Sequence, residues 1–387
     1  MAAARSRPLR VLITADAVGG VWTHVESLVR SRGLLAAGAR DEGLRIEYTV
    51  AVLGPEPPRP SAAMRGTPVH HLPGRLEWME APWADVRASA AWLRELADAV
   101  QPDVVHVNGF APAASGFAAP VLMGVHSCVC SWWRAVHGTA APPEWNTYRG
   151  MVRRGVQAAS LVVAPTAAML RLFEAEHGRV AHSMVIHNGG PALRSSGESV
   201  PAIVSVGRFW DEAKNLRVLD AVAPRLPWPI TVLGPIDGPS GLAHRPRHVR
   251  ALGPQPAAVV RQWLQRARIY AHPARYEPFG LAVLEAAQAG CALVLADLPS
   301  LREVWGTAAV YVTPDDDRAW ADTLRALIDA PARLDALATA ARRTARHYPA
   351  TVMAHRYQRA YAQLCGHARR PVAAPAPGWG LQPGAIS

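Results

Sequence analysis

The sequence Leu-Arg-Val-Leu-Ile-Thr-Ala-Asp-Ala-Val-Gly-Gly-Val-Trp at residues 9–22 determines how the chain begins to fold. Its first part, Leu9–Asp16, is rich in Val, Ile and Leu and predicts a buried β-strand. Gly19 and Gly20 predict a tight turn, because glycine adopts backbone conformations that other residues avoid. Trp22–Leu35 then has the spacing of an α-helix. A strand, a glycine turn and a helix in this order form the first unit of a parallel sheet.

The same alternation continues along the chain in two runs of similar length. Apolar strands between helices predict an α/β protein with two doubly wound, Rossmann-like halves, in which helices cover both faces of each parallel sheet. Strands are predicted at Leu9–Asp16, Ile46–Gly54, Asp103–Asn108, Pro120–His126, Leu161–Pro165 and Ser183–His187, and then at Ala202–Gly207, Ile230–Gly234, Val249–Gly253, Arg268–His272, Ala292–Ala296 and Ala309–Thr313. Helices are predicted at Trp22–Leu35, Asp85–Val100, Tyr148–Ala159 and Ala167–His177, and then at Leu216–Leu226, Pro256–Arg266, Gly280–Ala289 and Asp317–Ile328.

A turn-rich segment, Asn188–Pro201, separates the two runs, since it is rich in glycine, proline and serine. We therefore divide the chain into domains 1–195 and 196–349. A last helical segment occupies residues 350–365. Residues 366–387 are rich in proline and glycine and predict a disordered tail.

The composition excludes several classes of protein. Of the 387 residues, 50% are hydrophobic and 18% are charged, which excludes a chain that is disordered throughout. Four cysteines are too few for a disulfide scaffold and suit a reducing compartment. The most apolar stretch, Leu281–Ala296, is interrupted by Glu285 and Gln288 and falls short of a membrane span. The N-terminus lacks the long apolar core of a signal peptide, so we expect a cytoplasmic protein.

The formal net charge of +11 raises nucleic acid and anionic membranes as partners. The positive charge is spread over both halves, without a dense basic run that contains aromatic residues, which argues against nucleic acid. Such a surface suits an anionic small molecule or lipid head groups, so weak association with the inner membrane surface stays open. Of the 41 basic residues only Lys214 is a lysine. It is either a chance survivor in an arginine-rich chain or a position that requires a compact ammonium group.

Ligands of parallel sheets bind beyond the carboxyl ends of the strands, so the segments that follow strands are the candidate sites. The pair Gly19–Gly20 would let backbone N–H groups approach a phosphate or sugar, or would only form a turn. Arg208 and Lys214 follow the first strand of the second half, where two cations could neutralise a diphosphate. The alternative is a solvated loop in which both cations pair with Asp211 and Glu212.

The segment Tyr276-Glu-Pro-Phe-Gly-Leu-Ala-Val-Leu-Glu285 also follows a strand. Glu277 lies in the loop, and Glu285 lies one turn inside the helix that comes next. Carboxylates there accept hydrogen bonds from hydroxyls, while the free backbone N–H groups of Phe279–Leu281 can hold phosphate oxygens. Hydroxyls and phosphates in one pocket indicate a sugar nucleotide.

Polar and aromatic side chains follow a strand of the first half. His126 closes that strand, where it could orient a substrate, take part in proton transfer or serve as a structural residue. Trp132, Trp133, Trp145 and Tyr148 come next along the chain. They could stack on the sugar rings of an acceptor, contact lipid or pack in the core.

Two motifs that resemble metal sites are explained without a metal. Asp315–Asp317 resemble an acidic metal motif, but a proline precedes them and a helical pattern follows, so helix N-capping explains them. Cys128 and Cys130 are separated by one residue and lack the second cysteine pair of a zinc site. We expect no metal and no cofactor.

Taken together, these segments resemble the family 4 retaining glycosyltransferases, which have the GT-B fold of two Rossmann-like domains facing a central cleft. The resemblance covers about residues 9–365. The resemblance rests on Ala15-Asp-Ala-Val-Gly-Gly-Val-Trp22, on Gly207-Arg208 with Lys214-Asn215, and on Arg275-Tyr-Glu-Pro-Phe-Gly-Leu-Ala-Val-Leu-Glu-Ala286. Glu303 also lies where relatives carry a glutamate.

The resemblance implies a hexosyltransferase whose donor is a UDP- or GDP-linked sugar and whose acceptor is a hydroxyl of a glycan, a lipid-linked compound or a small molecule. Arg208 and Lys214 would bind the diphosphate, Glu277 the sugar hydroxyls and Glu285 the ribose. The helix at Thr351–Leu364 would cross back onto the first domain. The implied donor-binding residues are Gly19, Gly20, Arg208, Lys214, Glu277, Phe279, Gly280, Leu281 and Glu285, and the implied catalytic residues are His126, Arg208, Lys214 and Glu277.

Two other functions stay open. A sugar-nucleotide epimerase or hydrolase of the same fold would need no acceptor, and a non-enzymatic membrane-surface protein would use only the basic charge. A pyridoxal-phosphate phosphorylase is disfavoured, because Lys214 is the sole candidate for its Schiff-base lysine and lies in the predicted diphosphate loop.

Overall fold

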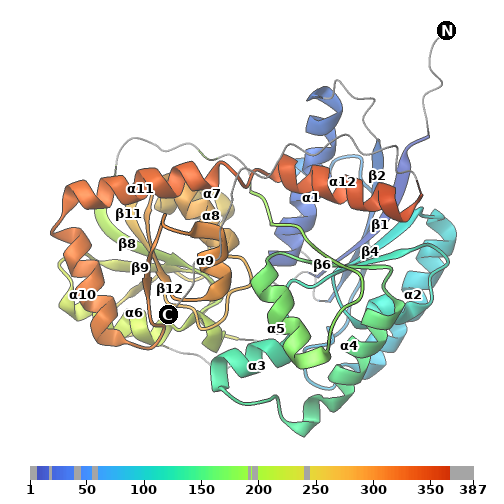
Figure 1. The fold of residues 1–387 in the computed structure, drawn as a ribbon, viewed down its shortest axis with the longest axis horizontal. Coiled ribbons are helices and arrows are strands. Elements are labelled where there is room, and N and C mark those ends of the chain that lie inside the picture. Colours follow the sequence, from blue (N-terminus) through green and yellow to red (C-terminus); the bar gives the residue numbers. More distant parts are fainter. Residues whose placement is uncertain are drawn as a thin grey trace, which may run out of the picture.

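A computed structural model of the chain describes residues 7–16, 20–38, 45–54, 60–190, 193, 199–238 and 245–366. Gly19 and the predicted tail beyond Gly366 lie outside the described residues, as does part of the predicted linker. The described residues form two lobes that lie side by side (Figure 1). Among the described helices, none combines the length and the hydropathy needed to cross a lipid bilayer.

The first lobe contains a parallel sheet of seven described strands in the order β3-β2-β1-β4-β5-β6-β7. Successive side chains of its central strand β1 point to opposite faces. Val11 and Ile13 therefore pack against helix α1, whereas Leu12 packs against helix α2. The elements are β1 (Leu9–Asp16), α1 (Gly20–Gly38), β2 (Ile46–Leu53), β3 (Val69–Leu72), α2 (Trp83–Val100), β4 (Val104–Val107), β5 (Val121–Gly124), α3 (Val129–His137), α4 (Asn146–Ala158), β6 (Leu161–Ala164), α5 (Ala167–His177) and β7 (Ser183–Val185).

The second lobe repeats this arrangement with a parallel sheet of six described strands in the order β10-β9-β8-β11-β12-β13. Its two helical layers enclose separate cores, one around Trp320 and one around Trp305. The elements are β8 (Val200–Val206), α6 (Leu216–Val222), β9 (Ile230–Leu233), β10 (Arg250–Ala251), α7 (Ala257–Arg266), β11 (Ala267–His272), α8 (Leu281–Ala289), β12 (Ala292–Ala296), α9 (Pro299–Trp305), β13 (Val310–Val312), α10 (Asp317–Ile328), α11 (Pro331–Ala345) and α12 (Ala350–Leu364).

The prediction of two parallel α/β halves is confirmed, and its errors have local causes. Strand β3 was not predicted because it lies at the sheet edge and carries the exposed His70 and His71 instead of an apolar run. Helix α11 was not predicted because its buried face contains mainly small residues. The predicted strand at Val249–Gly253 is only two residues long, and the predicted helix at Leu216–Leu226 ends at Val222.

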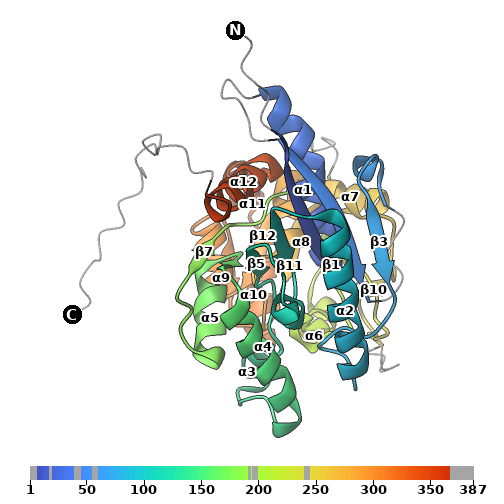
Figure 2. The same cartoon turned by 90° about the vertical axis from the view of Figure 1, so that its right-hand side faces the viewer.

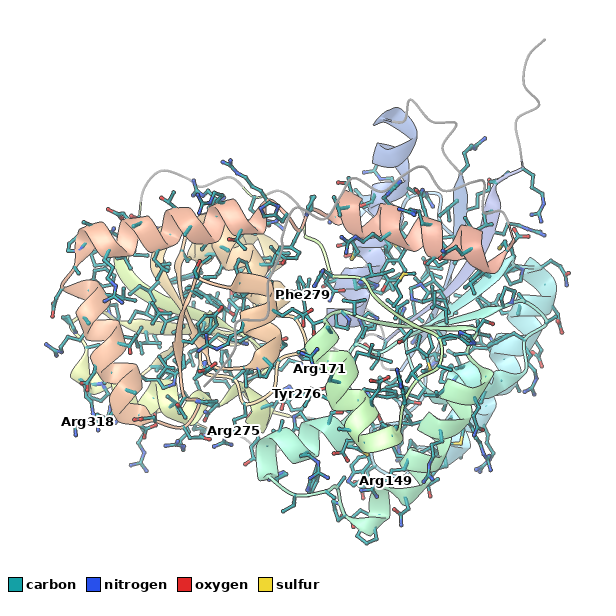
Figure 3. All side chains as sticks on the ribbon, viewed as in Figure 1. Arg149, Arg171, Arg275, Tyr276, Phe279 and Arg318 are labelled. Carbon is teal, nitrogen blue, oxygen red and sulfur yellow. The ribbon has the colours of Figure 1, made fainter. Side chains whose placement is uncertain are left out.

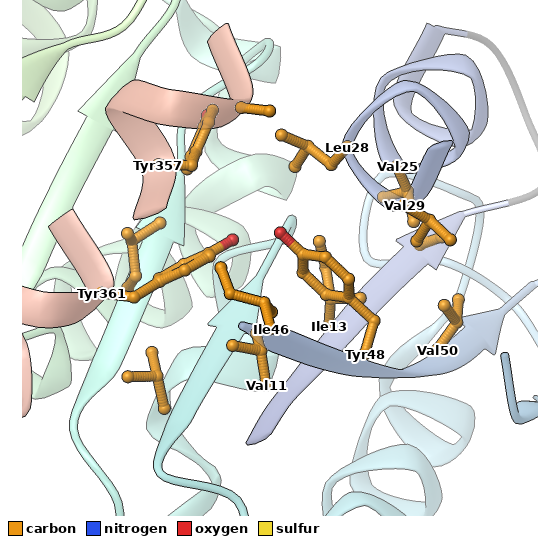
Figure 4. Close-up of a cluster of buried hydrophobic side chains, with 14 of the residues drawn as sticks. Val11, Ile13, Val25, Leu28, Val29, Ile46, Tyr48, Val50, Tyr357 and Tyr361 are labelled. Carbon is orange, nitrogen blue, oxygen red and sulfur yellow. The ribbon is translucent and has the colours of Figure 1, made fainter. Parts of the chain in front are cut away.

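Helix α12 leaves the second lobe and packs on the first, beside α1 (Figures 1 and 2). Tyr357 and Tyr361 enter the core formed by β1, β2 and α1, where Tyr361 and Tyr48 direct their hydroxyl ends toward each other (Figure 4). The Tyr361 hydroxyl lies 2.8 Å from Nδ1 of His106 in β4. The end of the chain that the structure describes is therefore fixed to its beginning.

In both sheets the early strands are added on one side of the first strand and the later strands on its other side. This places a topological switch point between β1 and β4 in one lobe and between β8 and β11 in the other. Crevices for ligands form at such points, beyond the carboxyl ends of the strands.

Gly234 directly follows β9. A substitution at this position tests how tightly the second switch point is packed. The φ of Gly234 is +135°, and a Cβ atom there would lie 1.9 Å from the carbonyl oxygen of Gly207. We expect Gly234→Ala to reduce the free energy of unfolding by about 3 kcal/mol, from overlap plus backbone strain. Gly253→Ala is the matched control, since Gly253 also has a positive φ but no atom within 4 Å of the added Cβ. It should cost about 1 kcal/mol in urea denaturation. Equal losses would contradict the close approach.

Candidate active site

A cleft of about 1180 Å³ lies between the lobes, at the carboxyl ends of the central strands of both sheets. Its walls contain residues from both lobes, so the two switch points face one shared space. Eight of the predicted site residues line it, namely Gly20, His126, Arg208, Lys214, Glu277, Phe279, Gly280 and Leu281. Glu285 is not among the lining residues, and Gly19 lies outside the described residues.

An ion pair between Lys214 and Glu277 lies at the second switch point. Nζ of Lys214 is 2.7 Å from Oε2 of Glu277, and the two side chains are 15% and 13% exposed. Nε2 of His272, the last residue of β11, lies 3.0 Å from the same oxygen. Burial alone would raise the pKa of Glu277, but the Lys214 charge and the His272 hydrogen bond hold that pKa far below its ordinary range. Glu277 is therefore a carboxylate at any physiological pH.

Helix α8 directs its N-terminus at the same space. Gly280 is its N-cap with a φ of +90°, and no side chain among the described residues caps the helix. The first intrahelical bond runs from the Leu284 N–H to the Gly280 oxygen, so the amides of the first turn stay available. Leu281 and Ala282 line the cleft, and Gly20 at the start of α1 faces Leu281 from the other lobe. This arrangement can bind an anion.

Arg208 is more exposed than Lys214 and has different partners. Its guanidinium is 3.9 Å from Asp211 and lies over the ring of Trp210, 5.3 Å from the ring centroid. The sequence left open a solvated loop in which Arg208 and Lys214 pair with Asp211 and Glu212, and the structure bears this out for Arg208 only. Arg208 has a loose partner in Asp211, whereas Lys214 turns to Glu277.

His126 in the first lobe has a defined tautomer. The Asn108 amide donates to the Thr14 carbonyl at 2.6 Å, so its oxygen faces Nε2 of His126 at 2.7 Å. Nε2 must therefore carry the proton, which leaves Nδ1 as the basic nitrogen. Burial lowers the pKa of His126 to about 4, so the imidazole is neutral at pH 7.

Direct polar contacts between described residues join the lobes next to the cleft. Tyr276 and Phe279 lie at the junction (Figure 3), and the Tyr276 hydroxyl accepts the Cys128 N–H. Glu303 accepts the N–H groups of Ala167 and Ala168 at 2.8 Å each, so it caps α5 across the junction and does not line the cleft. Further contacts include those from the Thr166 hydroxyl to the Pro278 oxygen and from Trp132 Nε1 to Asp211.

The aromatic residues after His126 divide between surface and core. Trp132, Trp133 and Trp145 are half-buried and line the cleft. Tyr148 also borders it but is only 2% exposed, and its hydroxyl accepts the Val129 N–H. Core packing therefore accounts for Tyr148, while the indole rings are available to a ligand.

Asp316 and Glu285 do not line the cleft. Asp316 accepts the Ala319 N–H at 2.8 Å, which confirms that this acidic motif caps α10. Glu285 lies one turn behind Leu281, where burial raises its pKa and Arg261 partly counteracts this.

Two family models match the chain and together cover most of it. The model described as Glycosyltransferase Family 4 matches residues 18–190, and the model described as Glycosyl transferases group 1 matches residues 200–330. The chain belongs to glycosyltransferase family 4.

Curated relatives of this family 4 protein match it over short segments. D-inositol 3-phosphate glycosyltransferase of Thermobispora bispora is 32% identical over 126 residues, which are 32% of this chain and 29% of that protein. Glycogen synthase of Mycobacterium tuberculosis is 41% identical over 81 residues, 20% of each chain. The chain therefore aligns with less than a third of either relative.

Solved structures share the fold over nearly the whole chain. Sucrose-phosphate synthase from Thermosynechococcus elongatus has a TM-score of 0.73 at 16% identity and covers 94% of this chain and 100% of its own. HepE of Anabaena, in complex with UDP and glucose, has a TM-score of 0.69 at 16% identity and covers 92% and 99%. This family 4 protein thus has the GT-B fold.

Among the polar residues of the cleft that sequence reasoning missed are His272, Asn108 and Glu77. His272 and Asn108 each stand at or just after the end of a central strand, so the strand-end rule could have found both. Glu77 lines the cleft from a loop and accepts the N–H groups of Phe110 and Ala111. No local pattern marks Glu77, because its partners lie far along the chain.

Removing one member of the ion pair between Lys214 and Glu277 should show how much the pair contributes to the free energy of unfolding. Lys214→Met leaves the Glu277 carboxylate buried with only His272, so we expect a loss of about 3 kcal/mol in the free energy of unfolding. Lys214→Met with Glu277→Gln should recover most of it. The pKa of Glu277 is lower in the folded state, so the pair's contribution holds at neutral pH and is lost as the pH falls below the ordinary range of glutamate. Arg318→Ala, at a highly exposed pair, should change nothing.

Replacing the partner of His126 should shift its titration. Asn108→Asp places a carboxylate against Nε2, which favours the imidazolium and should raise the His126 pKa from about 4 by at least one unit. NMR of ring-labelled histidine across a pH series measures this value. Asn108→Leu, which removes the hydrogen bond without adding charge, should leave the imidazole neutral. An unchanged pKa in Asn108→Asp would contradict the arrangement.

Proposed function

We propose that this family 4 protein is a retaining, metal-independent glycosyltransferase that moves a hexosyl group from a UDP- or GDP-linked sugar to a hydroxyl acceptor. The observation that carries the proposal is the convergence of Lys214, Arg208 and the uncapped N-terminus of α8 on one cleft that both lobes line. These groups match the charge of a diphosphate and stand beside the carboxylate of Glu277.

The donor fits this arrangement part by part. Lys214, Arg208 and the first amides of α8 would neutralise the diphosphate. Glu277, ionised and held by Lys214 and His272, would accept hydrogen bonds from the sugar hydroxyls. Glu285 would bind the ribose from one turn deeper in α8. The likeness to HepE, which binds UDP and glucose, supports a UDP-linked donor.

Fixed positive charge would lower the barrier of the reaction by stabilising the leaving group. As the bond between the anomeric carbon and the diphosphate breaks, negative charge builds up on the leaving phosphate, where Lys214, Arg208 and α8 stabilise it. The acceptor oxygen would attack from the same face of the sugar, and its proton would pass to a phosphate oxygen of the leaving group. Loss of one such stabilising group typically lowers the rate by about 10²–10³.

The acceptor would enter from the first lobe. Trp132, Trp133 and Trp145 offer aromatic faces to a sugar ring or another apolar face, and His126 offers a neutral imidazole near the reacting centre. The curated relatives are named for D-inositol 3-phosphate and for glycogen, two different hydroxyl compounds. We therefore propose the acceptor at the level of a hydroxyl group.

Donor-induced thermal stabilisation tests the proposal. We expect a UDP- or GDP-sugar to raise Tm with a chelator present, and Lys214→Ala and Glu285→Ala each to abolish the shift. Arg318→Ala, far from the cleft, should keep it. Nucleotide release should require an added acceptor. Inversion of the sugar without an acceptor would identify an epimerase instead, and a shift that needs a divalent ion would contradict the cationic site.

A further inference from the structure

Two cysteines and a histidine meet beneath the wall of the cleft. Cys128 is the N-cap of α3, Cys130 is its second residue and His177 ends α5. Sγ of Cys128 lies 3.1 Å from Nε2 of His177. The two sulfur atoms and a ring nitrogen of His177 all lie within 4.8 Å of one another. The sequence shows no second cysteine pair near Cys128 and Cys130, but the fold brings the His177 side chain to them from a distant helix.

These distances suit a tetrahedral metal ion. Zn²⁺ binds thiolate sulfur at about 2.3 Å and imidazole nitrogen at about 2.0–2.1 Å, so its ligands lie about 3.4–3.8 Å apart. Shifts of less than about 1 Å in the side chains would give this geometry. Two thiolates and one imidazole form a donor set that selects zinc over magnesium or calcium.

The surroundings keep the three donors in place. Cys128 and Cys130 are 1% and 0% exposed in an apolar core, and Phe173 in that core packs against the His177 ring at 4.8 Å. His177 is half-buried, which provides a route from solvent. The Cys128 N–H donates to the Tyr276 hydroxyl, so the backbone is anchored and the sulfur atom is left to bind.

We propose that Cys128, Cys130 and His177 bind one Zn²⁺, with the fourth position open toward the half-buried side of the site. The ion would fasten the start of α3 to the end of α5. Helix α3 carries Trp132, which reaches Asp211 of the second lobe, so the site would stabilise one wall of the cleft. This role is separate from the sugar-transfer chemistry, which the proposal leaves free of metal.

Cobalt serves as the spectroscopic probe. The full chain, reduced and stripped of metal, is titrated with Co²⁺. We expect one equivalent to produce a thiolate-to-metal charge-transfer band and the visible bands of tetrahedral cobalt, and Zn²⁺ to displace it. Cys128→Ser, Cys130→Ser and His177→Gln should each abolish or strongly reduce the bands. Cys291→Ser, which alters another buried cysteine in the second lobe, should keep them.

A second measurement separates binding from misfolding. Excess Zn²⁺ should raise the Tm of the wild-type chain by about 3 °C and leave the Cys128→Ser/Cys130→Ser variant unchanged. A Tm increase with the nucleotide sugar in that variant would show that its fold is intact. Absence of the cobalt bands in the wild-type chain, or their persistence in the double variant, would overturn the proposal.

Discussion

The ion pair between Lys214 and Glu277 is the interaction on which the rest of the site depends. Taking both charges out of water is costly, and a buried pair of this kind rarely stabilises a fold more than apolar residues would. Its value is that it fixes two opposite charges before a ligand arrives, at the place where strand β11 ends. His272 adds a hydrogen bond to the same carboxylate oxygen, so Glu277 keeps both its charge and its direction. The lobe has thus already met the energetic cost of positioning these groups.

The contacts between the lobes determine how this pre-formed site meets the other half of the cleft. Glu303 caps α5, Thr166 bonds to the Pro278 oxygen and Tyr276 accepts the Cys128 amide. Hydrogen bonds from His187 and the α5 amides outweigh burial and lower the pKa of Glu303, so this cap is ionised at neutral pH. Helix α12 continues the chain from the second lobe and packs into the core formed by β1, β2 and α1. These polar bonds hold the described conformation together with the apolar contacts of Ala213 and Tyr276 in a core of the first lobe. Any domain closure would have to change these contacts.

Patterns confined to a few neighbouring residues predicted most of the fold and many residues that line the cleft. The apolar strand Leu9–Asp16 and the segment around Glu277 lie at strand and helix boundaries, where periodicity and glycine carry the signal. What the sequence could not show are pairings between distant segments. The Glu77 carboxylate accepts from the Phe110 N–H, and the Asn108 amide donates to the Thr14 oxygen, so both bind backbone groups far along the chain. Lys214 pairs with Glu277, although Asp211 and Glu212 are nearer in the sequence.

The packing around Lys214 also explains why a lysine stands there in a chain that otherwise uses arginine. A Cβ atom on Gly207 would lie 3.5 Å from Cγ and 3.6 Å from Cδ of Lys214, so the lysine stem runs directly over this glycine. The ammonium at its end can donate to Glu277 and still offer protons to the cleft, because its three donors point in different directions. A guanidinium is planar and broader than an ammonium, so it would need more room beside Glu277. Arg208 is 36% exposed, against 15% for Lys214, and lies over the Trp210 ring, so it has room for that broader group. The difference in burial between the two positions therefore favours a compact cation at residue 214 and tolerates a broad one at residue 208.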